Sequence, residues 1–184
     1  MKKLLVIAII YALTLGLTSG VFAQDEESSA PELSVSGSID AYYRANLNNS
    51  NNASTAATMA PGSSFANNPG FSLGMANIIL GMDGEKTGFV ADLVFGPRGN
   101  DAVFNSLTGS TPIINQLYAY WNVSDGTTLT LGNFNTFLGY EVISPTANYN
   151  YSTSYMFSYG PFSHSGVKAD FTLSDDASLM LGIM

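Results

Sequence analysis

Residues 33–47 alternate between two kinds of side chain with a period of two. One set of positions carries Leu, Val, Ile, Ala and Tyr with a single Gly, and the other carries Ser, Asp, Tyr, Arg and Asn. Alternation held over fifteen residues predicts a β-strand with one apolar and one polar face. The segment is longer than the usual globular strand of about 5–6 residues. It also exceeds the about 9–11 residues with which a tilted strand crosses a bilayer.

The same alternation recurs in six further segments, and no segment predicts a convincing helix. The better apolar faces of these segments are Ala76, Ile78, Leu80 and Met82; Phe89, Ala91, Leu93 and Phe95; Leu117, Ala119, Trp121 and Val123; Leu129 and Leu131; Ser165, Val167, Ala169, Phe171 and Leu173; and Ala177, Leu179, Leu181 and Ile183. The sequence therefore predicts an all-β fold with about seven strands.

Short and long connections alternate between these strands without exception. The turns at 83–86, 124–127 and 174–176 are short and rich in Asp, two of them as Asp-Gly, which suits antiparallel hairpins. The connections at 48–70, 96–115 and roughly 137–163 are long. Transmembrane barrels show this asymmetry, because their periplasmic turns are short and their extracellular loops are long. The pattern predicts an antiparallel transmembrane β-barrel rather than a soluble sandwich.

Charge is scarce, and its placement agrees with this interpretation. Only 11% of the residues are charged, against about 25% in ordinary soluble domains. The charged residues inside the predicted strands all fall on the polar face, which leaves the apolar face suited to lipid. They are Asp40, Arg44, Asp92, Lys168 and Asp170.

The N-terminal segment is typical of an export signal. Lys2 and Lys3 precede an apolar stretch over 4–17, and small residues lead to Ala23, after which cleavage is expected. The apolar stretch is shorter than the about 20 residues that span a bilayer as a helix. We therefore predict a signal peptide over 1–23, an acidic linker over 24–32 and barrel sequence over 33–184.

Several function classes find no support in the sequence. The net charge of −8 argues against a nucleic-acid partner. With no Cys and one His, the chain offers no Cys-based or multi-His metal site, and no Gly-rich phosphate loop opens a helix. Ser163 and Ser165 flank His164 on a predicted strand, where neighbouring side chains point to opposite faces. We therefore expect no enzyme activity, no metal and no cofactor.

The third long connection carries the most specific motifs. Gly139-Tyr140-Glu141 and His164-Ser165-Gly166-Val167, together with Gly96-Pro97 after the third strand, give the chain a resemblance to the OmpL-like β-barrel porin family of Gram-negative outer membranes. The resemblance extends over 33–184 and implies an outer-membrane barrel that passes small solutes. Thr153 stands where this resemblance would lead us to expect an arginine, so no anion preference is carried over.

Nine residues are candidates for the pore lining: Asp40, Tyr42, Arg44, Asp92, Tyr118, Tyr120, Glu141, Lys168 and Asp170. Eight lie on predicted polar faces, and Asp40 and Arg44 are about 13 Å apart along one strand, too far for direct pairing. Glu141 lies in a long connection that either folds into the lumen as a constriction or packs on the rim.

The segments above give seven predicted strands. Seven is odd, whereas bacterial single-chain barrels use even numbers from about 8 upward, so we expect this chain to be the N-terminal part of a larger barrel. Its expected partners are outer-membrane lipid, small solutes and further copies of itself. Two alternatives remain: an exported adhesion sheet that binds surfaces, and a structural barrel plugged by its loops.

Overall fold

The computed structural model describes residues 31–47, 65–103 and 113–184. Residues 31–184 belong to one compact unit. The predicted signal peptide, most of the acidic linker, and parts of the first two long connections lie outside the described residues.

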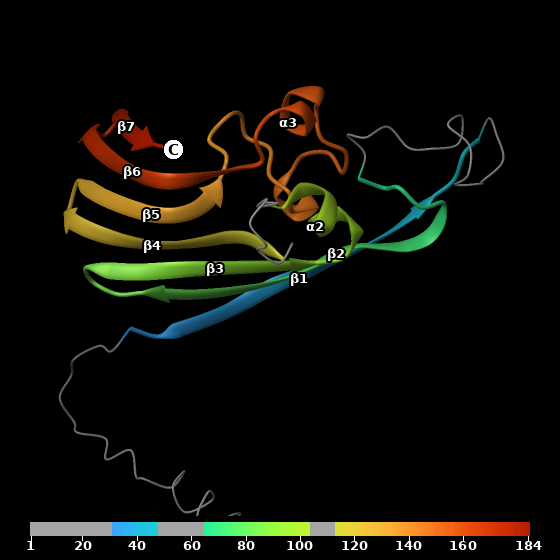
Figure 1. Ribbon diagram of the computed structural model, residues 1–184, viewed down its shortest axis with the longest axis horizontal. Coiled ribbons are helices and arrows are strands. Elements are labelled where there is room, and N and C mark those ends of the chain that lie inside the picture. The colour runs from blue at the N-terminus through green and yellow to red at the C-terminus, as the bar shows by residue number, and fades with distance from the viewer. Residues whose placement is uncertain (1–30, 48–64, 104–112) are drawn as a thin grey trace, which may run out of the picture. The chain divides into compact units, whose positions relative to one another are not determined.

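The described residues form one sheet of seven antiparallel strands (Figure 1). Each strand pairs with its neighbours in sequence, so the order is β1-β2-β3-β4-β5-β6-β7. The predicted all-β fold is confirmed, and the sheet is not closed, since β1 and β7 are its two edges. The strands are β1 (Leu33–Arg44), β2 (Gly70–Asp83), β3 (Thr87–Phe95), β4 (Ile114–Ser124), β5 (Thr127–Asn135), β6 (Ser163–Ser174) and β7 (Ala177–Ile183).

Within the described parts of the long connections, where no helix was predicted, the structure has three short helices. They are α2 (Pro97–Ala102), η2 (Pro145–Ala147) and α3 (Tyr155–Tyr159). None exceeds six residues, so none is long enough to give the 3.6-residue periodicity by which helices are recognised in sequence. Figure 1 shows α2 and α3 on the same side of the sheet, toward the strand ends that carry the long connections. No helix among the described residues combines the length and apolarity that crossing a membrane requires.

In a water-soluble protein the apolar face of a sheet is buried and the polar face is exposed, whereas in this sheet the arrangement is reversed. We name the face that packs against α2 the inner face and the opposite one the outer face. On the outer face, the side chains of Ile39 and Ile183 are 79% and 84% exposed. On the inner face, the Asp92 side chain is 4% exposed, and Asp40 and Thr130 are also buried. Apolar side chains thus face outward, and polar ones face inward.

A bulge in β2 changes which positions of that strand are apolar. Asp40 pairs with Met75, but the next residue of β1 pairs with Leu73, so Gly74 is an extra residue. Before the bulge, the residues on the outer face have odd numbers, as Phe71 and Leu73 do. After the bulge they have even numbers, as Ile78 does. For this reason the apolar alternation was recognised only from Ala76 onward, whereas β2 already begins at Gly70. The predicted end of the first strand at 47 was too late, since β1 ends at Arg44.

A small apolar core covers part of the inner face. Met75 of β2 and Val94 of β3 are buried against residues of α2 and of the connection between β5 and β6. The other members of this cluster are Phe65, Ala102, Val103, Ile143 and Phe157, with Phe162 packed against them. The core therefore holds residues of all three long connections against the inner face.

Aromatic residues lie at both ends of the outer face. Tyr43 and Phe71 are exposed at the ends that carry the long connections, with ring centroids 4.8 Å apart. Trp121 and Phe171 lie near the short turns, opposite Thr87 and Thr127. Two aromatic bands flanking an apolar zone are typical of membrane-spanning barrels.

Candidate functional site

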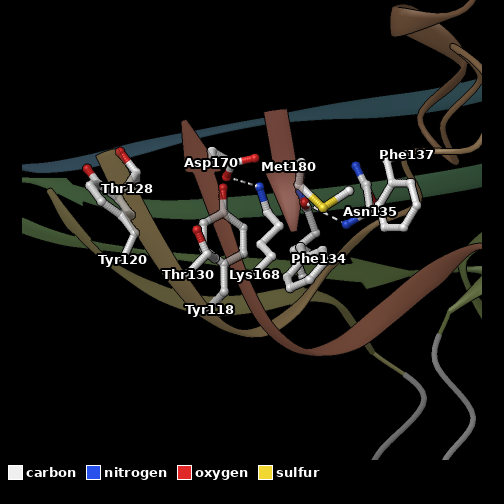
Figure 2. A pocket seen from close by; sticks show the side chains of 11 residues that line it. Tyr118, Tyr120, Thr128, Thr130, Phe134, Asn135, Phe137, Lys168, Asp170 and Met180 are labelled. Atoms are coloured by element: carbon white, nitrogen blue, oxygen red, sulfur yellow. Dashed lines mark hydrogen bonds and ion pairs between the residues drawn. The ribbon is translucent and has the colours of Figure 1, made fainter. Parts of the chain in front are cut away.

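The inner face holds two pockets that are joined by shared residues. The first lies over β4–β7 and has a volume of about 540 Å³ (Figure 2). It brings together four of the predicted lining residues: Tyr118, Tyr120, Lys168 and Asp170. The remaining lining residues are Gln116, Thr128, Thr130, Phe134, Asn135, Phe137 and Met180.

The charges of this first pocket neutralise one another. The ammonium group of Lys168 donates to the Asp170 carboxylate over 2.5 Å. The same ammonium group lies 5.5 Å from the centroid of the Phe134 ring, a cation–π distance, and Tyr118 meets that ring edge-on. The Tyr120 hydroxyl donates to Asp83. The pocket thus presents hydroxyls, amides and aromatic rings without an unpaired charge.

The second pocket lies over β1–β4 and reaches the connection between β5 and β6, with a volume of about 410 Å³. Its residues include Asp92, whose carboxylate accepts from Asn115 over 2.6 Å and from Asn77 over 3.3 Å. Gln116 and Asn135 also line the first pocket, so the two are contiguous. The remaining lining residues are Ser36, Gly37, Ser38, Ile79, Val142, Ser144, Thr146 and Ala147.

A buried arginine in α2, which was missed at the sequence level, holds the connections in place. The Arg98 side chain is fully buried and donates to the Ile143 carbonyl over 2.6 Å and to the Tyr151 carbonyl over 2.9 Å. Its guanidinium carbon also lies 5.0 Å from the ring centroids of Phe65 and Tyr151. Burial lowers the pKa of Arg98, while the nearby Tyr151 and Asp40 oppose this shift.

Tyr151 links this arginine to the wall of the sheet. Its hydroxyl donates to Asp40 over 2.7 Å, and its ring packs at 5.9 Å from that of Tyr42. Burial raises the pKa of Tyr151, and the hydrogen bond to Asp40 raises it further. Asp40, Tyr151 and Arg98 therefore form one chain of contacts, which we name the latch. Of the predicted lining residues, Asp40 belongs to the latch and Tyr42 contacts it through Tyr151.

Glu141 lies in the connection between β5 and β6, where it supports α3. Its carboxylate is buried and accepts from the backbone N–H of Ser154, over 2.7 Å, and from the Ser154 hydroxyl. The same hydroxyl accepts from Phe157 as the N-cap of α3. The Glu141 carboxylate therefore supports the start of α3, and its place at a constriction or on the rim stays a prediction.

Two further residues singled out in the sequence lie nearer the strand ends. Arg44 ends β1 and donates to the Asn67 carbonyl over 3.2 Å. His164 lies 3.1 Å from the Thr136 hydroxyl and stacks on Phe137 with ring centroids 4.3 Å apart. Among the described residues, no group of three or more His, Cys, Asp and Glu side chains could hold a metal ion.

One feature of the sequence could have identified Arg98 as a structural residue. Only six residues of the chain are basic, and Arg98 follows Gly96-Pro97, where the strand ends. Gly96 has a φ of 103°, which favours glycine, and Pro97 begins α2. A basic residue placed just after such a turn, in a chain so poor in charge, was a candidate for a structural role.

The comparisons with known proteins agree with this architecture. The model of the family described as "Putative beta-barrel porin-2, OmpL-like" matches residues 32–184. No curated protein and no solved structure matches the chain. The match covers the whole sheet with its inner-face pockets and latch. The chain therefore belongs to the OmpL-like family of porin-type β-barrels.

Proposed function

We propose that this chain forms part of an outer-membrane β-barrel through which small solutes diffuse passively. The observation that carries the proposal is the inverted burial of the sheet, with apolar side chains exposed outward and polar ones turned inward. An exposed apolar face is costly in water and favourable in lipid, whereas hydroxyl, amide and charged groups on the inner face suit a water-filled lumen. Export by the N-terminal segment and residence in the outer membrane are part of the same proposal.

A second candidate, the plugged structural barrel, is favoured by one specific observation. The latch and the apolar core fix α2 and the connection between β5 and β6 onto the inner face. If these segments fill the cross-section of the lumen, solutes do not pass. The two pockets lie beside this packed region and would form the open part of the lumen in a porin.

The test is conductance of the purified protein in planar lipid bilayers, with swelling of vesicles in glucose as a second readout. Stepwise current in KCl and glucose-driven swelling are the results expected of a porin. A protein that inserts, resists carbonate extraction and shifts its gel mobility on boiling, but carries no current, is a plugged barrel. A protein that washes off the membrane and shows no mobility shift is an exported sheet of another kind, and the porin proposal fails.

A further inference from the structure

The second pocket contains a carboxylate whose charge no neighbouring base neutralises. Asp92 is held by the amide groups of Asn77 and Asn115, and no described basic group forms an ion pair with it. None of the residues that line this pocket is Lys, Arg or His. The first pocket differs, because Asp170 there is paired with Lys168. A carboxylate without a counter-charge in a largely buried site favours a cation beside it.

Two further oxygens of the same pocket lack hydrogen-bond donors. The side-chain carbonyl oxygens of Asn115 and Asn135 are buried and accept no hydrogen bond, and both residues line the pocket. The Asn115 side chain is 4% exposed. Buried acceptors are nearly always satisfied, and leaving one empty costs about 1–3 kcal/mol. The residues that line this pocket thus include two amides whose oxygens lack donors, and one carboxylate that has amide donors but no counter-charge.

We propose that the second pocket is a binding subsite for small organic cations that carry a primary ammonium group. An ammonium has three N–H donors and one positive charge, which match two amide oxygens and one carboxylate. The volume of about 410 Å³ admits a small organic solute, and Ile79, Val142 and Ala147 supply apolar contact for its carbon chain. The inference deepens the proposed function, on which it rests for solute access, by naming a preferred class of solute.

The test uses the full-length protein in planar bilayers, with propylammonium as the probe and 1-propanol as its uncharged analogue. We expect propylammonium to reduce the KCl current in a concentration-dependent manner, and propanol to leave it unchanged. In Asp92→Asn, which keeps the side-chain shape, half-block should require about tenfold more propylammonium, the effect of losing a hydrogen bond to a charged acceptor. In Asn135→Asp, which adds a second carboxylate, half-block should require less.

Asp125→Asn is the matched control, because it removes the same charge from the turn between β4 and β5, outside both pockets. Half-block of this variant should require the same propylammonium concentration as half-block of the unaltered protein. The subsite is overturned if propylammonium blocks all of these proteins equally, or if it does not block a measurable current of the unaltered protein. If Asp92→Asn does not fold, Asn135→Asp decides, since unchanged block there also overturns it.

A binding readout separates this inference from the porin proposal. Propylammonium should raise the temperature at which the folded protein loses its fast gel mobility, and should do so less in Asp92→Asn. This shift requires no conduction. A shift without any current supports the subsite and refutes the porin, whereas current without block or shift supports the porin and refutes the subsite.

Discussion

The latch carries charge into the most buried part of the described chain. Arg98 has no exposed surface, and its hydrogen bonds reach two carbonyls that lie 45 and 53 residues further along the chain. Tyr151 then contacts Asp40 across a separation of 111 residues. One guanidinium therefore ties the connection after β3 to the connection after β5, and through Tyr151 to β1. The planar, permanently charged fork of arginine suits such a position better than lysine does.

Replacing Arg98 by methionine should destabilise the folded barrel strongly. The substitution removes the donors that Arg98 supplies to the Ile143 and Tyr151 carbonyls, and it removes the positive charge beside Asp40. Removing one partner from a buried charged network costs about 3–5 kcal/mol. Urea unfolding in lipid vesicles, followed by the loss of heat-modifiable mobility, measures the change. Lys86→Met, in the exposed turn between β2 and β3, is the control and should change the stability by less than about 0.5 kcal/mol.

Tyr151 should make the stability fall at high pH. Its pKa is raised above the ordinary value of 10.0, so above pH 10 the unfolded chain releases the phenolic proton while the folded protein keeps it. The folded state then binds more protons than the unfolded state, and the free energy of unfolding decreases as pH rises. Unfolding in urea between pH 9 and 11.5 measures this slope. In Tyr151→Phe the slope should be shallower, even though the variant is less stable at pH 8, and equal slopes would contradict the assignment.

At the scale of elements, the strands could be predicted and the inward-folded connections could not. Strand residues such as Ile39 and Leu131 obey a local rule, because lipid and lumen select opposite side chains at alternate positions. The bulge at Gly74 breaks that rule by one residue, and it shortened the predicted strand for this reason. The latch depends on contacts between distant segments, which no local pattern encodes. Of the three latch residues, only Asp40 was among the predicted lining residues. Its position in the alternating pattern of the strand placed it on the polar face.

Gly74→Ala should weaken the contact between β1 and the latch. A Cβ atom built at Gly74 would lie 1.8 Å from a carboxylate oxygen of Asp40 and 2.8 Å from the Tyr151 hydroxyl. The bulge therefore leaves space for this hydrogen bond, and the substitution should cost about 1–3 kcal/mol by displacing it. Gly81→Ala in the same strand is the control, because the atom nearest its new Cβ is the hydroxyl of Ser34, which can rotate away. Urea unfolding of both variants checks the difference, and equal loss in the two would contradict the role of the bulge.

At the scale of the whole sheet, the inverted faces determine where the protein can reside. In a water-soluble sheet a charge added to an exposed position is tolerated, because that face already contacts water. In a membrane barrel the same position contacts hydrocarbon, and a basic residue at mid-depth costs about 2–4 kcal/mol. The family match and the burial pattern agree on the barrel. A substitution at one position of the outer face therefore tests directly whether that face contacts water or lipid.

Leu131→Lys should reduce insertion of the folded protein into lipid vesicles. Leu131 is the middle residue of β5 and is 62% exposed on the outer face. Thr128→Lys adds the same charge to the same strand on the inner face, where it lines the first pocket. Thr128→Lys should insert normally. In a KCl gradient it should shift the reversal potential toward the equilibrium potential of chloride. The measured quantity is the fraction of protein that reaches the heat-modifiable, carbonate-resistant form. If Leu131→Lys inserts as well as Thr128→Lys, the outer face does not contact lipid, and the barrel assignment of this face is wrong.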